Sequence, residues 1–217
     1  MRVLVACEYS GRVREAFRKR GHDAWSCDLR PADDGSQYHY QGDVMSLMKG
    51  TPNNNFWDLM IAHPPCTYLA VSGAQWFYHP DDKHLPTEQR RPHPKHMNRR
   101  AKQDEAAAFF MALAESPIAK IAIENPVCVM SSRWRKPDQI IQPYEHGDPF
   151  KKTTCLWLKG LPLLEPTDIV EPHIKQYADG SRFSADYAFG SGKDRSKSYQ
   201  GIADAMAEQW GGLNEWI

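Results

Sequence analysis

Hydrophobic residues in the first third of the chain occur in short runs that end at polar turns or prolines. Residues 2–7 (RVLVAC), 23–29 (DAWSCDL) and 57–62 (WDLMIA) are three such runs, and the last is followed by a Pro-Pro pair one residue later. These runs predict β-strands, because β-branched and aromatic residues favour extended backbone and proline cannot donate to a sheet ladder. Residues 119–124 (AKIAIE) and 153–160 (TTCLWLKG) predict two further strands.

Apolar residues recur at helical spacing in other segments. Helices are expected over residues 12–20, 101–116 and 202–210, where apolar side chains fall three or four positions apart. Strands that alternate with helices predict an α/β fold with a doubly wound, mainly parallel, Rossmann-like sheet and helices on both faces. Ligands bind such sheets at the carboxyl ends of the strands. Four polar residues are expected there: Glu8, Asp28, Cys66 and Glu124.

The balance of charge excludes a protein that coats nucleic acid through a global positive field, since Lys+Arg and Asp+Glu each number 27. Five cysteines, none in a Cys-x-x-Cys pair, favour a reduced, cytoplasmic protein without a metal site. No apolar run approaches the roughly 18 residues of a membrane span. The length predicts one catalytic domain over residues 1–217 and leaves the oligomeric state open.

Two long stretches fall outside the alternating pattern. Residues 78–102 are broken by prolines and rich in cationic side chains, and from residue 83 onward they hold one acid, Glu88, against seven basic residues. We interpret this stretch as a basic mobile loop that contacts phosphates, in which case each phosphate neutralised on duplex DNA steepens the log–log salt dependence by about 0.9. Residues 165–200 form the second irregular stretch, which contains several glycines.

The sequence places a thiol and a carboxyl where they could act on a heterocycle. Cys66 follows a strand and two prolines, so a stiff backbone holds its sulfur at the edge of the site. An ordinary thiol is only about 3% thiolate at neutral pH, so nucleophilic attack needs help. Glu124, at the end of another strand, supplies it if its pKa is raised by burial, because a protonated carboxyl that donates to a ring nitrogen activates the adjacent carbon.

Other residues fit a nucleotide-like cofactor. Residues 6–13 (ACEYSGRV) predict a strand, a turn and a helix whose first N–H groups suit a carboxylate or another anion. Asp28 ends the second strand and can accept from both hydroxyls of a ribose. Asp43 follows a later polar turn and can accept from an adenine amino group. The order and spacing of these acids predict a cofactor site beside the thiol.

At this point the chain resembles the cytosine carbon-5 DNA methyltransferases. Residues 63–73 (HPPCTYLAVSG) resemble the family's Pro-Pro-Cys motif, and residues 121–126 (IAIENP) resemble its Glu-Asn-Val motif. Three weaker matches are residues 6–11 with the glycine-rich first motif, residues 147–160 with the Gly-x-Pro-Gln-x-Arg-x-Arg strand, and the helix from Gly201 with the last motif. The resemblance covers roughly residues 2–160 and 199–211.

The resemblance implies transfer of a methyl group from S-adenosylmethionine to carbon 5 of cytosine in single- or double-stranded DNA, by a small, phage-like member of the family. It implies that the catalytic residues are Cys66, Glu124 and Lys152. The implied cofactor-binding residues are Cys7, Glu8, Tyr9, Ser10, Gly11, Asp28, Leu29, Asp43, Val44 and Pro64. The implied substrate-binding residues are Pro65, Ser72, Arg90, Arg91, Arg99, Arg100 and Asn125.

Several departures from the family bear on specificity and on the cofactor. The first motif keeps only Gly11, and the arginines of the later strand motif are replaced by Lys152 and Thr154. Only about forty residues separate Gly160 from Gly201, where the family inserts a recognition region of about a hundred. The resemblance therefore implies that residues 165–200 are a reduced substrate-recognition region. Because contacts to base edges carry sequence specificity, relaxed or absent sequence preference is expected.

Three alternatives remain open from the sequence. One is methylation of an exocyclic amino group, whose enzymes carry Asn- or Asp-Pro-Pro-Tyr or -Phe where this chain has residues 63–66. Another is an enzyme acting on free cytidine nucleotides, and a third is an inactive regulator that kept the fold and binds DNA or protein. The phosphate-loop-like residues 190–196 and the pair His93 and His96 are set aside, because they lack the remaining elements of a phosphate loop or a metal site.

Overall fold

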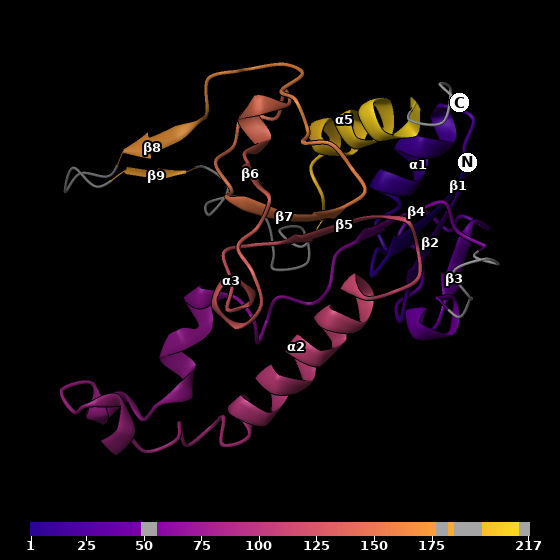
Figure 1. Cartoon of the computed structure of the whole chain (residues 1–217). Coiled ribbons are helices and arrows are strands. Elements are labelled where there is room, and N and C mark those ends of the chain that lie inside the picture. The colour runs from indigo at the N-terminus through magenta and orange to yellow at the C-terminus, as the bar shows by residue number, and fades with distance from the viewer. Residues whose placement is uncertain (49–55, 177–181, 185–196, 213–217) are drawn as a thin grey trace.

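The computed structural model describes residues 1–48, 56–176, 182–184 and 197–212 (Figure 1). Seven strands form one sheet in the order β3-β2-β1-β4-β5-β7-β6. Their bounds are β1 Arg2–Ala6, β2 Asp23–Asp28, β3 His39–Gln41, β4 Leu59–Ala62, β5 Lys120–Asn125, β6 Gln139–Ile141 and β7 Thr154–Lys159. The strands β1 to β5 run parallel to one another, whereas β7 runs antiparallel to both β5 and β6. The sheet is therefore mixed and mainly parallel.

Helices cover both faces of this sheet (Figure 1). The helices α1 (Arg12–Lys19) and α5 (Gln200–Gly211) lie together on one face, where Phe17 and Trp210 belong to one buried cluster with Val5 and Ile61 of the sheet. The helix α2 (Arg99–Ala114) lies on the other face and contributes Phe110 to a second cluster. Burial on both faces explains the continuous apolar runs of β1 and β4. The predicted α/β, doubly wound, Rossmann-like class is confirmed.

The expectation of repeated strand-then-helix units is corrected between β2 and β4. A loop and the short strand β3 follow β2, and a single 3₁₀ turn, η1 (Val44–Ser46), follows β3. The edge strand β6 and the helix α3 (Met130–Arg133) were also not predicted. Each has only three or four residues, too few to show a period of 2 or 3.6.

Short elements occupy the two irregular stretches. Residues 71–89 hold the 3₁₀ helices η2 (Val71–Phe77), η3 (Pro80–Asp82) and η4 (Thr87–Gln89), and a further one, η5 (Pro143–Glu145), precedes β7. The basic stretch ends inside α2, whose first residue is Arg99. The strands β8 (Ile174–Gln176) and β9 (Arg182–Ser184) form an antiparallel pair away from the main sheet (Figure 1). No helix in the described part of the chain is long and apolar enough to cross a membrane.

The strand order fixes where a ligand site lies. The chain leaves β1 toward β2 on one side, and later strands β4 and β5 lie on the other side. In an open α/β sheet the crevice at such a switch point opens at the carboxyl ends of the strands. The residues that follow β1, β2 and β4, together with the last residues of β5, therefore meet there.

Candidate functional site

One cleft of about 410 Å³ lies at this edge of the sheet, and it is lined by Cys66, Glu124, Lys152 and Asp28. A second hollow of about 360 Å³ lies next to it and holds Asp43. The wall that the two hollows share consists of Cys7, Asp28, Leu29 and Pro65. The structure thus brings the thiol, the carboxyl and the two candidate cofactor acids into one continuous site.

The loop after β4 holds Cys66 at the surface of the cleft. Pro64 and Pro65 stiffen the chain, and the side-chain amide of Asn125 donates to the carbonyl of Pro64 at 2.9 Å. The carbonyl of Cys66 accepts from the N–H groups of two residues that follow it, Leu69 and Ala70. The Cys66 side chain is exposed. Asn125, expected to contact substrate, lines the cleft and also anchors this loop from the end of β5.

The environment of Cys66 keeps its thiol protonated in the free protein. Its pKa is raised because the surrounding protein desolvates the thiolate, while the charge of Lys152 works in the opposite direction and that of Glu124 adds to the increase. All five cysteines lie in the described residues, and Cys66 is the exposed one. Burial raises the pKa of Cys7 and of Cys27 to about 12 and that of Cys155 to about 11, so these thiols are inert.

Glu124 is paired with His63, which sequence reasoning did not assign to the site. Ala62 of β4 lies beside Ile123 of β5, so the next residues, His63 and Glu124, lie side by side and point to the same face. The Nδ1 atom of His63 is 3.1 Å from Oε2 of Glu124. His63 directly follows one predicted strand, and Glu124 ends another. The sequence does not give the register between these two strands, which brings the two side chains together.

The protonation of this pair differs from the expectation. Burial alone would lower the pKa of His63, but the hydrogen bond and negative charge of Glu124 outweigh it and raise that pKa. Burial alone would raise the pKa of Glu124, yet His63 and Lys152 lower it. The predicted raised pKa of Glu124 is therefore wrong, because two cations lie near the carboxylate. The pair holds its proton on the imidazole.

The second nitrogen of His63 points away from Glu124. Its Nε2 atom is buried and has no hydrogen-bond partner among the described residues. His63 lines a small cavity of about 10 Å³ with Glu8, Ser10 and other residues of the loop after β1, and the charge of Glu8 also raises the pKa of His63. A cavity of this volume takes about one water molecule. His63 thus lies between the carboxylates of Glu124 and Glu8.

Lys152 is a cation that lines the cleft, as Arg30 does. It lies in the loop before β7, and its charge lowers the pKa of both Cys66 and Glu124. Its ammonium group is 5.3 Å from the ring centre of Tyr199, just before α5. Lys152 stands where the family that the chain resembles has an arginine. Its position suits stabilisation of a thiolate or of negative charge that develops on a substrate.

The acids of the second hollow are held by local backbone amides. Asp28 accepts from the N–H of Arg30 at 2.9 Å, and Asp43 accepts from the N–H of Met45 at 3.0 Å. Apolar groups lie between them, among them Leu29, which is 74% exposed. Val44, Pro65 and Phe109 are further apolar residues of this hollow's lining. Fixed carboxylates around an apolar floor suit a flat ring that carries hydroxyl and amino donors.

The N-terminus of α1 does not offer a free anion site, contrary to the expectation. The Glu8 side chain is 4% exposed and turns toward the helix, where its carboxylate accepts from the N–H groups of Val13 and Arg14 at 2.8 and 3.2 Å. Ser10 donates its hydroxyl to the same carboxylate at 3.2 Å. An internal acid already satisfies the helix dipole and the first N–H groups. Glu8 therefore caps α1.

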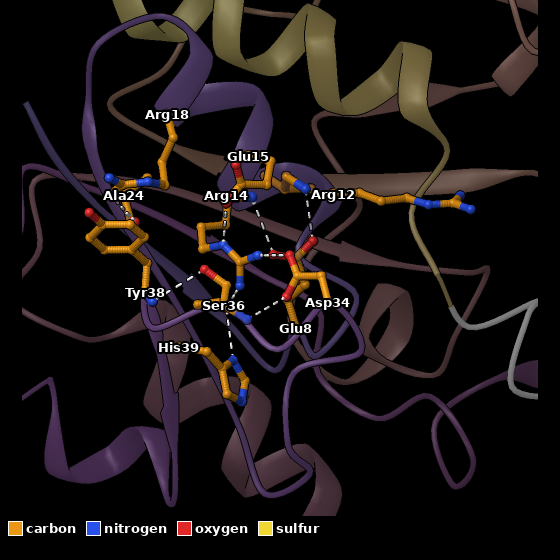
Figure 2. Close-up of polar contacts among 12 residues, drawn as sticks. Glu8, Arg12, Arg14, Glu15, Arg18, Ala24, Asp34, Ser36, Tyr38 and His39 are labelled. Atoms are coloured by element: carbon orange, nitrogen blue, oxygen red, sulfur yellow. Dashed lines mark hydrogen bonds and ion pairs between the residues drawn. The ribbon is translucent and has the colours of Figure 1, made fainter.

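The remaining residues of this loop are packed closely. Tyr9 is buried and its carbonyl accepts from the N–H of Asp33. Gly11 has a φ of 75°, and a Cβ atom there would lie 2.3 Å from the guanidinium of Arg14. That guanidinium is fully buried and pairs with Glu15 and Asp34 (Figure 2). The pairing ties the loop after β2 to α1 and so positions the end of β2.

Arginines of the basic stretch are engaged within the protein. Arg91 forms a bidentate contact with the buried carboxylate of Asp82. Asp82 directly precedes residues 83–102, in which Glu88 is the one acid. Arg90 donates to the carbonyls of Lys83 and Leu85, and Arg100 donates to the hydroxyl of Tyr78. Arg99 is 7% exposed and donates to the carbonyl of Thr67 at 2.9 Å. The stretch is therefore folded on itself.

Other expectations fall outside the cleft or outside the described residues. Ser72 is exposed and lines a different hollow, on the other side of Cys66 and Thr67. The phosphate-loop-like residues 190–196 lie outside the described residues. Within the described ranges, no group of three or more His, Cys, Asp and Glu side chains is arranged to hold a metal ion. His93 and His96 instead pack against each other, with ring centres 4.9 Å apart.

No protein-family model and no curated protein sequence matches this chain. Among solved structures, a crystal structure of a mutant of Spodoptera frugiperda DNMT2 aligns with a TM-score of 0.39 and 13% sequence identity. The alignment covers 80% of this chain and 57% of that chain, so this chain spans less than two thirds of that protein's length. A likeness of this strength carries no argument about activity.

Proposed function

We propose that this protein transfers a methyl group from S-adenosylmethionine to carbon 5 of cytosine in DNA, with Cys66 as the covalent nucleophile and with relaxed or little sequence specificity. The observation that carries the proposal is the single cleft in which an exposed thiol, a carboxyl and a lysine meet beside a hollow with two fixed acids. Thiol, acid and cation are the groups that addition to a pyrimidine ring requires.

The second hollow fits the adenosine part of the donor. Asp28 can accept from the ribose hydroxyls and Asp43 from the adenine amino group, while Val44 and Phe109 offer apolar contact to the ring. When bound, S-adenosylmethionine supplies an electrophilic methyl group. The amino-acid end of the donor meets a loop whose helix N-terminus is already capped by Glu8, so other groups of the loop must hold its carboxylate.

The residues of the cleft then act on the cytosine ring. Cys66 loses its proton to solvent, which the charge of Lys152 favours, and its sulfur forms a bond to carbon 6. Electrons move toward ring nitrogen 3 and make carbon 5 nucleophilic, so that it takes the methyl group and leaves S-adenosylhomocysteine. Loss of the carbon 5 proton to solvent and breakage of the carbon 6–sulfur bond then restore the aromatic ring and the thiolate of Cys66.

The His63–Glu124 pair holds the proton that ring nitrogen 3 needs. As negative charge develops on the ring, the proton moves from His63 to the carboxylate of Glu124 and on to nitrogen 3, which leaves a neutral imidazole. Elimination returns the proton by the same route. No proton has to enter from solvent at the addition step, and the separation of 3.1 Å between the two residues is that of a hydrogen bond.

Replacing His63 by Asn tests this route. Transfer at neutral pH is expected to fall by about 10- to 100-fold, because Glu124 alone must then carry the proton and a carboxyl is largely ionised at neutral pH. The ratio of variant to wild-type kcat/KM is expected to rise as the pH is lowered from about 8 to 5, where Glu124 becomes protonated. Because both proteins need the same Cys66 thiolate, that requirement cancels in the ratio.

A matched control is His79→Asn, since His79 pairs with Asp81 at 3.5 Å outside the cleft. Its ratio to the wild-type kcat/KM is expected to stay constant with pH. A His63→Asn ratio that is also independent of pH would show that His63 only packs against Glu124.

The function itself is tested by product analysis. Purified protein is incubated with labelled S-adenosylmethionine and with single-stranded DNA, duplex DNA or free cytidine nucleotides, and the digested products are separated. Label in 5-methylcytosine from DNA is the expected result, with single strands preferred because a duplex target must be flipped out at a cost of a few kcal/mol. Label on the exocyclic amino group, or only on free nucleotides, would contradict the proposal, and no label beside intact DNA binding would indicate a regulator.

A further inference from the structure

A further hollow, which we call the Trp76 hollow, adjoins Cys66 on the side away from the candidate cofactor acids. It has a volume of about 360 Å³ and shares Cys66 and Thr67 with the candidate active-site cleft. Its far wall is formed by Trp76 of η2, by His96, which precedes α2, and by Arg99, the first residue of α2. None of the steps proposed for methyl transfer uses this space.

An exposed indole forms part of this hollow. Trp76 is 42% exposed, although a tryptophan is ordinarily buried. The rings of His93 and His96 pack against it in T-shaped contacts, with centres 5.3 and 5.4 Å from that of the indole. These contacts hold the indole in one orientation at the rim. A fixed, partly exposed aromatic ring is the platform on which nucleic-acid bases stack.

Cationic side chains line the Trp76 hollow and a neighbouring hollow of about 290 Å³. Arg99 lines both of them, and Lys95 and Lys102 line the neighbouring one. No acidic side chain of the described residues lines either one. Arg99 is buried and, within the described ranges, forms no ion pair with an acid.

The neighbouring histidine responds to this field. The pKa of His93 is lowered by burial and by the charges of His96, His79, Lys95 and Arg99.

We propose that this hollow is a subsite for the nucleotide next to the target cytosine in a DNA strand, with its base against Trp76 and its phosphate near Arg99 and Lys102. The inference rests on the proposed function, because it takes Cys66 as the position of the target base. The positive charge of these side chains favours a chain that carries phosphates over a peptide with few or no acidic residues. The subsite makes a strand of two or more nucleotides, rather than a free nucleotide, the substrate.

The test measures binding rather than turnover. Fluorescence anisotropy of a labelled single-stranded hexadeoxynucleotide that contains one cytosine gives the dissociation constant, and displacement by deoxycytidine 5′-monophosphate gives that of the mononucleotide. Trp76→Ala is expected to weaken oligonucleotide binding by about 10-fold or more, because one stacked base is lost. The same variant should leave mononucleotide binding unchanged, and Trp76→Phe should stay close to the wild type.

Trp134→Ala is the matched control, since Trp134 is also an exposed tryptophan but does not line the hollow. It should leave both dissociation constants unchanged. Equal oligonucleotide binding by Trp76→Ala and the wild type would overturn the subsite, as would an equal loss for the mononucleotide. If binding depends on Trp76 while no methylated product forms, the proposed function fails and the subsite stands.

Discussion

Cys66→Ser is expected to lower methyl transfer by about 10³-fold or more, because a hydroxyl is far less acidic and less nucleophilic than a thiol at neutral pH. The substitution replaces one sulfur atom by oxygen at an exposed position and leaves the backbone turn that holds the residue, so the fold and the binding of donor and DNA should not change. The measurement is single-turnover transfer of labelled methyl groups to an oligonucleotide. Transfer by the variant within tenfold of the wild type would rule out the covalent route.

A fluorinated substrate makes the same prediction visible as a mass. When carbon 5 of cytosine carries fluorine in place of hydrogen, no proton can leave carbon 5 after methyl transfer. The adduct between Cys66 and carbon 6 should therefore accumulate in the wild type. Cys66→Ser should form none. Cys128→Ala is the control, because Cys128 is 2% exposed and does not line the cleft, and it should form the adduct as the wild type does.

The main strands and helices could be predicted because their sequences carry long-enough patterns. The buried runs of β1, β4 and β5 and the apolar faces of α1, α2 and α5 agree with their expected positions within a few residues. The short strands β3 and β6 could not be found in this way, since their pairing is decided by neighbours distant in sequence. The antiparallel direction of β7 likewise depends on how the chain returns to the sheet.

At the site, the sequence indicated which residues reach the strand ends but not how they pair there. Cys66 and Glu124 line one cleft, as their positions at strand ends implied, and Lys152, which the family resemblance implied, lines it too. The role of His63 depends on the register between β4 and β5, and the protonation of Glu124 depends on His63. A pKa is a property of three-dimensional neighbours, so burial alone gave the wrong direction for Glu124.

The charges counted along the sequence also did not show which basic residues have internal partners. Residues 78–102 were interpreted as contacting phosphates because the partners of their arginines cannot be recognised from the sequence. Asp82 takes the charge of Arg91, and backbone carbonyls accept from the guanidinium of Arg90. Glu8, expected to bind the cofactor, accepts from the first N–H groups of α1. The sequence does not show these internal partners, because the fold decides which groups meet.

Gly201→Ala is expected to destabilise the protein by about 3 kcal/mol or more, and to lower its melting temperature by roughly 6–12 °C. A Cβ atom at this position would lie 1.6 Å from the carbonyl oxygen of His146 and 2.7 Å from its carbonyl carbon. Backbone atoms cannot move aside as a flexible side chain would. The start of α5 would have to separate from the loop after η5, breaking the 2.8 Å hydrogen bond from the Gly201 N–H to Asp148.

The loss should spread beyond this contact because α5 packs on α1 through the cluster that contains Trp210 and Phe17. Calorimetry of the purified variants measures it, with Gly212→Ala as the matched control at the other end of the same helix. A Cβ atom on Gly212 would meet nothing within 4 Å, and its φ of −77° suits any residue, so that variant should melt within about 2 °C of the wild type. Equal melting temperatures for Gly201→Ala and Gly212→Ala would contradict the close approach of α5 to His146.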